Sequence, residues 1–163
     1  AKQDMILEEL YRISFDEKIN RIRSALYLLR GDSTKLAERL TVGRAHAEDI
    51  RKLWIILTSF DTLLADTTRL VCANRNLREI DPLRLELLLN SIDLSLAKLL
   101  SLLKIASERT NEWKTANTSD RLSSILKHLS TLTEYNDLRT ISQKTKEKVS
   151  ITEELADKLA AFN

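Results

Sequence analysis

The sequence predicts an all-α fold, an antiparallel bundle of four long helices in up-down-up-down order. Three observations lead to this expectation. The 163 residues include only two Gly and one Pro, so most of the residues that make tight turns are missing. Apolar residues recur every three or four positions over long stretches, as on one face of an α-helix. No β-branched run alternates with polar residues between turn signals, as a strand would require.

The first helix is expected over residues 3–30. Its apolar residues are spaced alternately by four and three: Phe15, Ile19, Ile22, Leu26 and Leu29. This spacing is typical of a coiled-coil seam or of the buried face of a bundle helix. We expect Gly31-Asp32-Ser33 to form a turn, because Gly suits the position after a helix and Asp or Ser suits the next N-cap.

The second helix is expected over residues 34–77. Its stripe continues through Leu36, Leu40, Gly43, Ala47, Ile50, Trp54, Leu57, Asp61, Leu64, Thr68 and Val71. Four of these residues are small or polar, which leaves room for close helix approach or for a ligand. An isolated ionised Asp61 would be costly to bury, so we expect it to pair with an Arg or to lie at the edge of the bundle.

Two further helices complete the predicted bundle. Asp81-Pro82 is a strong start signal, with Asp as N-cap and Pro at the first helical position, and predicts a helix over residues 82–115. A polar turn follows, and the fourth helix is expected over residues 119–162. The length suits one domain covering residues 1–163.

Composition argues against several classes of partner. The 26 basic and 24 acidic residues are interspersed and give a net charge of +2, so we expect no nucleic-acid binding. No apolar run approaches the roughly 20 residues that span a bilayer. Membrane attachment is therefore expected only through flanking segments outside this sequence. The single Cys72 cannot form an internal disulfide.

The usual signatures of catalysis and of metal binding are missing from the sequence. His46 and His128 are the only histidines, and neither belongs to a recognisable ligand motif. There is no Gly-x-Ser-x-Gly elbow and no glycine-rich phosphate loop. We therefore predict no catalytic residue, no metal and no cofactor in this domain. An enzyme that uses buried carboxylates of the bundle core is the remaining catalytic alternative.

Candidate ligand-binding residues come from the geometry of the apolar faces. Arg presents a planar fork of donors that matches a carboxylate, and several Arg residues flank the faces that should meet inside the bundle. The candidates are Arg23, Arg44, Asp61, Thr68, Arg69, Arg109 and Trp113. The alternative for each Arg is a solvated side chain at the bundle edge.

One segment resembles a known family. Residues 22–36, and above all Tyr27-Leu28-Leu29-Arg30-Gly31-Asp32, resemble a phrase in helical extracytoplasmic sensor domains of bacterial sensor histidine kinases and chemoreceptors, of the four-helix and helical bimodular types. There an early helix ends in such a phrase before a short turn. The acidic residue that precedes the phrase in the bimodular type is replaced by Ser24-Ala25-Leu26, so no ligand residue can be transferred.

This resemblance implies a periplasmic domain of an inner-membrane receptor, which dimerises and detects a small molecule or a periplasmic binding protein. Signalling would occur by small shifts between helices, and a kinase domain could lie elsewhere in the full-length protein. The alternative is a non-catalytic coiled-coil or bundle module, in the cytoplasm, that binds other proteins or acts as a scaffold. Native flanking sequence would separate the two, because the receptor needs transmembrane segments there.

Overall fold

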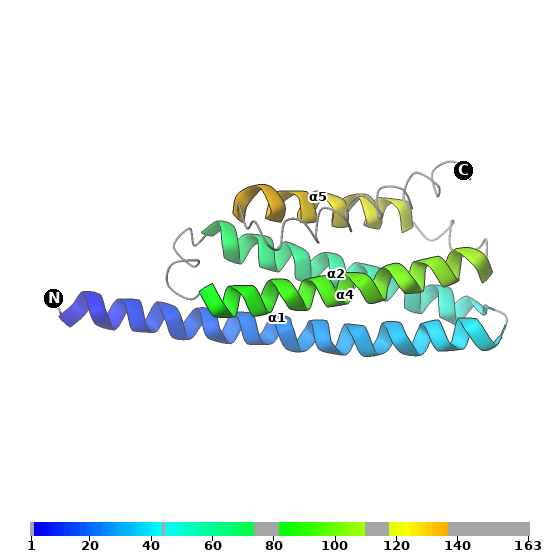
Figure 1. Ribbon diagram of the computed structural model, residues 1–163, viewed down its shortest axis with the longest axis horizontal. Helices are drawn as coiled ribbons and strands as arrows, with labels where there is room; N and C mark the ends of the chain where they lie inside the picture. Colours follow the sequence, from blue (N-terminus) through cyan, green and yellow to red (C-terminus); the bar gives the residue numbers. More distant parts are fainter. Residues whose placement is uncertain (1, 44, 74–81, 110–117, 137–163) are drawn as a thin grey trace.

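Four long helices make up the part of the chain that the computed structural model describes, residues 2–43, 45–73, 82–109 and 118–136 (Figure 1). They are α1 (Lys2–Val42), α2 (Ala47–Ala73), α4 (Pro82–Arg109) and α5 (Thr118–Asn136). Within these ranges the regular structure is entirely helical. The predicted all-α fold with four long helices is therefore confirmed.

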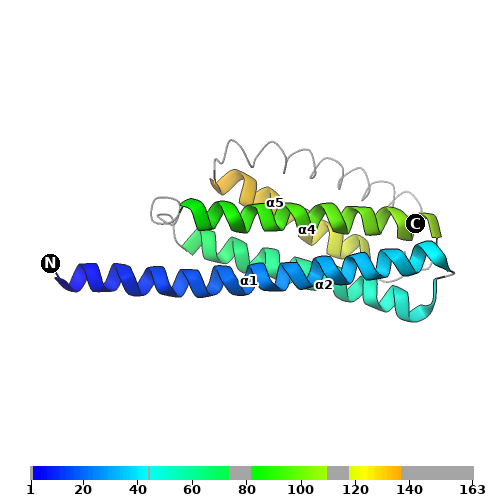
Figure 2. The same ribbon diagram turned by 60° about the horizontal axis from the view of Figure 1, so that its bottom comes forward.

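Successive helices alternate in direction, as expected for an up-down bundle (Figure 1). The most extensive contact, however, is between α1 and α4, which run in the same direction. α1 also packs against α2, and α2 packs against α5 (Figure 2). Ser91 and Ser95 of α4 are buried in the bundle, and such small side chains allow neighbouring helices to approach closely.

The predicted turn at Gly31-Asp32-Ser33 is wrong, because α1 continues through it to Val42. The buried stripe explains why. Leu29, Ser33, Leu36 and Leu40 keep the spacing of four and three, and all four are buried. Ser33 fits the stripe because its hydroxyl donates to the carbonyl of Leu29 at 2.8 Å. The free energy gained by burying Leu36 and Leu40 on the same helix face outweighs the roughly 1 kcal/mol that Gly31 costs inside a helix.

α1 ends instead at Val42, and α2 begins at Ala47. The carbonyl of His46 accepts from the backbone N–H groups of Asp49 and Ile50, which makes His46 the N-cap of α2. The Asp49 carboxylate in turn accepts from the N–H of His46 at 3.0 Å, as the third residue of a capping box does. Asp49 also accepts a hydrogen bond from Nε of Arg39 at 2.9 Å. One carboxylate therefore links the end of α1 to the start of α2.

The starts of α4 and α5 agree closely with the expected ones. α4 begins at Pro82, the residue that the start signal indicates, and α5 begins at Thr118. α2 begins at Ala47 rather than at residue 34, as a consequence of the longer α1. The expected helix ends at 77, 115 and 162 lie outside the described residues.

One apolar core joins the four helices. Each helix contributes a residue with no exposed surface, namely Leu26, Leu57, Leu88 and Ile125. Phe60 of α2 is the largest of the fully buried side chains. A single shared core means that the described helices support one another rather than forming separate units.

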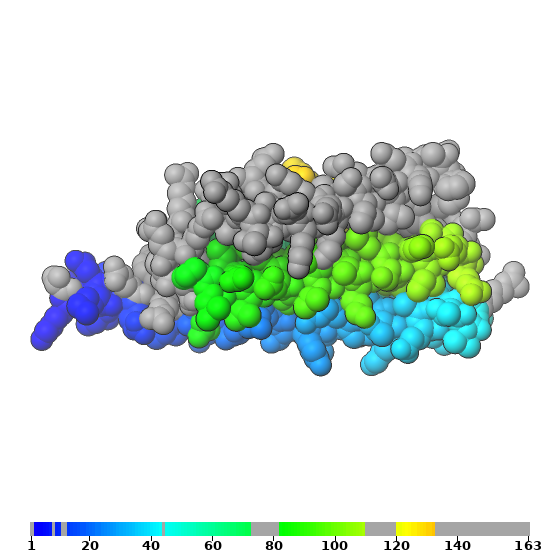
Figure 3. Space-filling view, viewed as in Figure 1, coloured from blue at the N-terminus to red at the C-terminus, as the bar shows by residue number. Residues whose placement is uncertain are grey.

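The N-terminal part of α1 extends beyond the other described helices (Figure 3). The core stripe begins at Phe15, and counting back by three and four residues gives Arg12 and Glu8. The apolar residues of this segment therefore lie on other faces of the helix, and they are exposed: Met5, Ile6, Leu7, Leu10 and Ile13. We call these five residues the α1 extension surface.

Candidate functional site

An open cleft lies where α1 and α4 meet, and we call it the α1–α4 cleft. It encloses about 500 Å³ and is lined by Asn20, Arg23, Ser24, Tyr27, Leu28, Arg30 and Ser91. Six of these residues come from α1 because they recur at helical spacing on the face beside α4. The described lining residues include two Arg and no Asp or Glu, so an anion would meet no repulsion from them.

Arg30 forms a polar layer between α1 and α4. Its Nη1 donates to the carbonyl of Ser91 at 3.1 Å, to the Ser91 hydroxyl at 3.0 Å and to the Ser95 hydroxyl at 3.2 Å. The guanidinium also lies 5.6 Å from the ring centroid of Tyr27, within the range of a cation–π contact. Because its Nη1 donates to Ser91 and Ser95, Arg30 links α1 to α4 at this level.

Arg23, one of the sequence candidates, has a different environment. Its Nε is buried and has no hydrogen-bond partner. Leaving a buried donor unsatisfied costs about 1–3 kcal/mol, and an acceptor entering the cleft would remove that cost. The structure thus places Arg23 about two helical turns before Arg30 on α1, and both line the cleft. Sequence reasoning missed Arg30 because that residue was assigned to a helix end.

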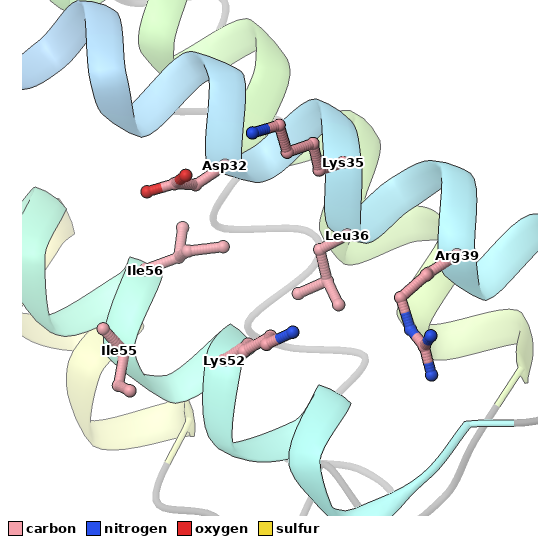
Figure 4. Close-up of a pocket in the computed structure, with 7 residues that line it drawn as sticks. All are labelled: Asp32, Lys35, Leu36, Arg39, Lys52, Ile55 and Ile56. Carbon is pink, nitrogen blue, oxygen red and sulfur yellow. The ribbon is translucent and has the colours of Figure 1, made fainter.

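A second cleft lies between α1 and α2, and we call it the α1–α2 cleft (Figure 4). It encloses about 290 Å³ and is lined by Asp32, Lys35, Leu36, Arg39, Lys52, Ile55 and Ile56. The hydrogen bond to Asp49 raises the pKa of Arg39, so the charge of Arg39 is already paired. Sequence reasoning did not predict this cleft, because it placed the lining residue Asp32 in a turn rather than in the first helix.

Asp61 is the centre of a polar cluster between α2 and α5. Its two oxygens accept from the Ser124 hydroxyl at 2.8 and 2.9 Å, and His128 Nδ1 lies 2.9 Å from Oδ1. Arg121 Nη1 is 3.6 Å from Oδ2, and its guanidinium lies 5.7 Å from the ring centroid of Trp54. The expected pairing of Asp61 with an Arg is therefore confirmed, and its oxygens are engaged in helix packing.

The other candidates are not brought together. Thr68 donates to the carbonyl of Leu64 within its own helix at 2.8 Å. Arg69 pairs with Asp66 on the surface of α2, and Arg109 is exposed near the end of α4. Arg44 and Trp113 lie outside the described residues. The five described candidates thus do not form one site, and Arg23 is the one among them that lines a cleft.

Metal and membrane features were also sought in the ranges that the structure covers. There, no three His, Cys, Asp or Glu side chains gather closely enough to hold a metal ion. None of the described helices combines the length and the apolar character needed to cross a lipid bilayer.

Comparisons with known proteins identify no family for this chain. No family model matches the sequence, and neither the curated proteins nor the solved structures include a match. What is established is therefore an all-helical arrangement of four long, mutually packed helices. Any statement about activity must come from the clefts and surfaces themselves.

Proposed function

We propose that this chain is the extracytoplasmic ligand-sensing domain of a bacterial transmembrane receptor, a sensor histidine kinase or a chemoreceptor. Its ligand would be a small organic anion in the α1–α4 cleft. The observation that carries the proposal is that Arg23, whose Nε is buried and unpartnered, lines a cleft whose described lining residues include no Asp or Glu. This cleft is better support than the phrase Tyr27–Asp32, because the turn expected after that phrase does not exist.

Arg23 determines the chemistry of the proposed ligand. A guanidinium binds a carboxylate through two parallel hydrogen bonds, which Lys cannot reproduce. The neighbouring Asn20 and Ser24 on α1 add short polar side chains to the same lining. A small organic acid therefore fits the cleft better than an amine or a neutral sugar.

The position of the cleft suggests how binding could become a signal. The Arg30 layer links α1 to α4 through Ser91 and Ser95. A carboxylate bound beside Arg30 would compete with those serine oxygens for its donors. A ligand that binds one alignment of the two helices more tightly than another shifts the population between them, and a small helix shift is a known form of switching.

Thermal shift against a panel of organic acids, amino acids and amines tests the binding site. A ligand at 100 times its dissociation constant should stabilise the chain by about 2.7 kcal/mol. Arg23→Gln should abolish the shift and Arg23→Lys should weaken it, while Arg109→Gln, an exposed Arg outside the cleft, should keep it. A shift that survives Arg23→Gln would rule out this site.

The receptor assignment needs a separate test. The native gene should encode an apolar segment of about 20 residues on each side of this sequence. A gene without them would exclude the receptor while leaving the anion site open to test.

The α1 extension surface favours a second function, a module that associates with other helices. Five exposed apolar residues within nine positions form an unusual patch for a monomer, because such patches often mark interaction sites. We propose that this segment pairs with a second copy to form a homodimer. Sedimentation of the wild type should give a dimer and Leu10→Glu a monomer. A monomeric wild type would contradict this proposal.

A further inference from the structure

The α1–α2 cleft has an apolar floor and a charged rim (Figure 4). Leu36 of α1 and Ile56 of α2 are buried at its base. Ile55 forms an exposed apolar wall, with 46% of its surface accessible. Asp32, Lys35 and Lys52 stand around this apolar area. Such a combination, mostly apolar with a few polar groups, is typical of small-molecule sites.

The rim carries an excess of positive charge that is not neutralised inside the protein. Arg39 is paired with Asp49 at 2.9 Å. Within the described part of the chain, Lys35, Lys52 and Asp32 have no ion pair. The rim therefore carries two unpaired ammonium groups and one unpaired carboxylate. Charge complementarity therefore favours an anion over a cation.

We propose that the α1–α2 cleft binds a small amphiphilic carboxylate. Its acid group pairs with Lys52 and Lys35, and its short apolar chain lies on Leu36, Ile55 and Ile56. The volume of about 290 Å³ is near the lower end of the range for ligand pockets, so a short alkyl acid fits better than a long one. This site is independent of Arg23 and of the function proposed for the α1–α4 cleft.

The two parts of the ligand contribute differently. Ion pairs at an exposed rim are weak and are screened by salt, so the apolar chain supplies most of the affinity. Each additional buried methylene should tighten binding by about fourfold. The charged groups then determine which amphiphile is accepted, and Asp32 should weaken the binding of any anion.

Titration calorimetry of the full chain with butanoate, hexanoate, hexanol and hexylamine tests the proposal. We expect hexanoate to bind more tightly than butanoate and more tightly than the equally long alcohol or amine. Equal affinity for hexanoate and hexanol would overturn the role of the lysines. Equal affinity for butanoate and hexanoate would overturn the role of the apolar floor.

Variants at exposed positions sharpen the test without disturbing the core. Lys52→Gln and Ile55→Gln should each weaken hexanoate binding severalfold, whereas Asp32→Asn should strengthen it. Arg109→Gln, which removes an exposed cation outside both clefts, should leave hexanoate binding unchanged. Loss of binding in Arg109→Gln, or no change in Lys52→Gln, would refute the assignment.

Discussion

His128 of α5 and Asp61 of α2 are joined by a contact of 2.9 Å between Nδ1 and Oδ1. A carboxylate oxygen accepts hydrogen bonds, and an imidazole nitrogen that carries a proton donates them, so the two groups are complementary. Asp61 is 8% exposed and also accepts from Ser124. One nearly buried carboxylate therefore helps to hold α5 on α2, in addition to the apolar core.

Replacing Asp61 by Ala should lower the free energy of unfolding by about 1–3 kcal/mol, because donors from α5 would lose a buried acceptor. Urea denaturation measures the change. Asp66→Ala is the matched control, since Asp66 pairs with Arg69 on the surface of the same helix and surface changes usually stay within about 0.5 kcal/mol. Equal losses for the two variants would contradict the packing role of Asp61.

The contact between Asp61 and His128 should also appear as coupling. Residues in one hydrogen-bond network typically show interaction energies of about 0.5–3 kcal/mol in a double-mutant cycle. We expect the Asp61→Ala, His128→Ala pair to lose less stability together than the two single variants lose in sum. Strict additivity would mean that the contact does not stabilise the fold.

Asp49 should make stability depend on pH. Burial raises the pKa of Asp49, but the hydrogen bonds from Arg39 and from the backbone of His46 outweigh it, and the pKa lies below the ordinary carboxyl value. A lowered folded-state pKa adds stability above the unfolded-state pKa of about 3.9. That contribution is lost as the pH falls through the lower folded-state pKa.

Comparison of Asp49→Asn with the wild type isolates this effect. The variant should lose about 1 kcal/mol at neutral pH, as helix caps typically contribute, and the difference should shrink in acid. Urea titrations at a series of pH values below 5 would measure it. A difference that stays constant down to the lowest pH would contradict the contribution of the ionised Asp49.

The variant Gly31→Ala tests whether the chain is helical at residue 31 or forms a turn there. Gly31 lies within α1, and a Cβ built there meets nothing within 4 Å. Ala should therefore stabilise the chain by about 0.5–1 kcal/mol, since Gly loses more conformational freedom on folding. Thermal or urea unfolding measures the gain, with Lys18→Ala at an exposed position of α1 as control. A loss of stability would indicate a left-handed turn at Gly31.

Leu36→Ala tests whether the stripe of α1 continues into the core after Gly31. Leu36 is 2% exposed and belongs to the same buried cluster as Leu29. Its truncation should cost about 2–5 kcal/mol. Leu28→Ala is the control, because Leu28 is 67% exposed. Similarly small losses of stability in Leu36→Ala and Leu28→Ala would show that the second half of α1 is not packed as described.

Sequence reasoning succeeded where apolar residues recur at helical spacing. The stripe from Phe15 to Leu29 is buried in the structure, as is much of the α4 face. It failed at Gly31, where a local preference for a turn was given more weight than the stripe that continues through Leu36 and Leu40. Tertiary burial overrode the local preference, which is small for a single Gly in a long helix.

The sequence by itself determined that this chain forms long amphipathic helices, because apolar spacing defines a face independently of what covers it. It also singled out Arg23 and Asp61. Only the tertiary structure decided that α4 makes its most extensive contact with α1, that Arg30 binds Ser91 and Ser95, and that two clefts open beside α1. The physical reason is that apolar faces are not specific for one partner, whereas a site requires side chains from two particular helices at one level.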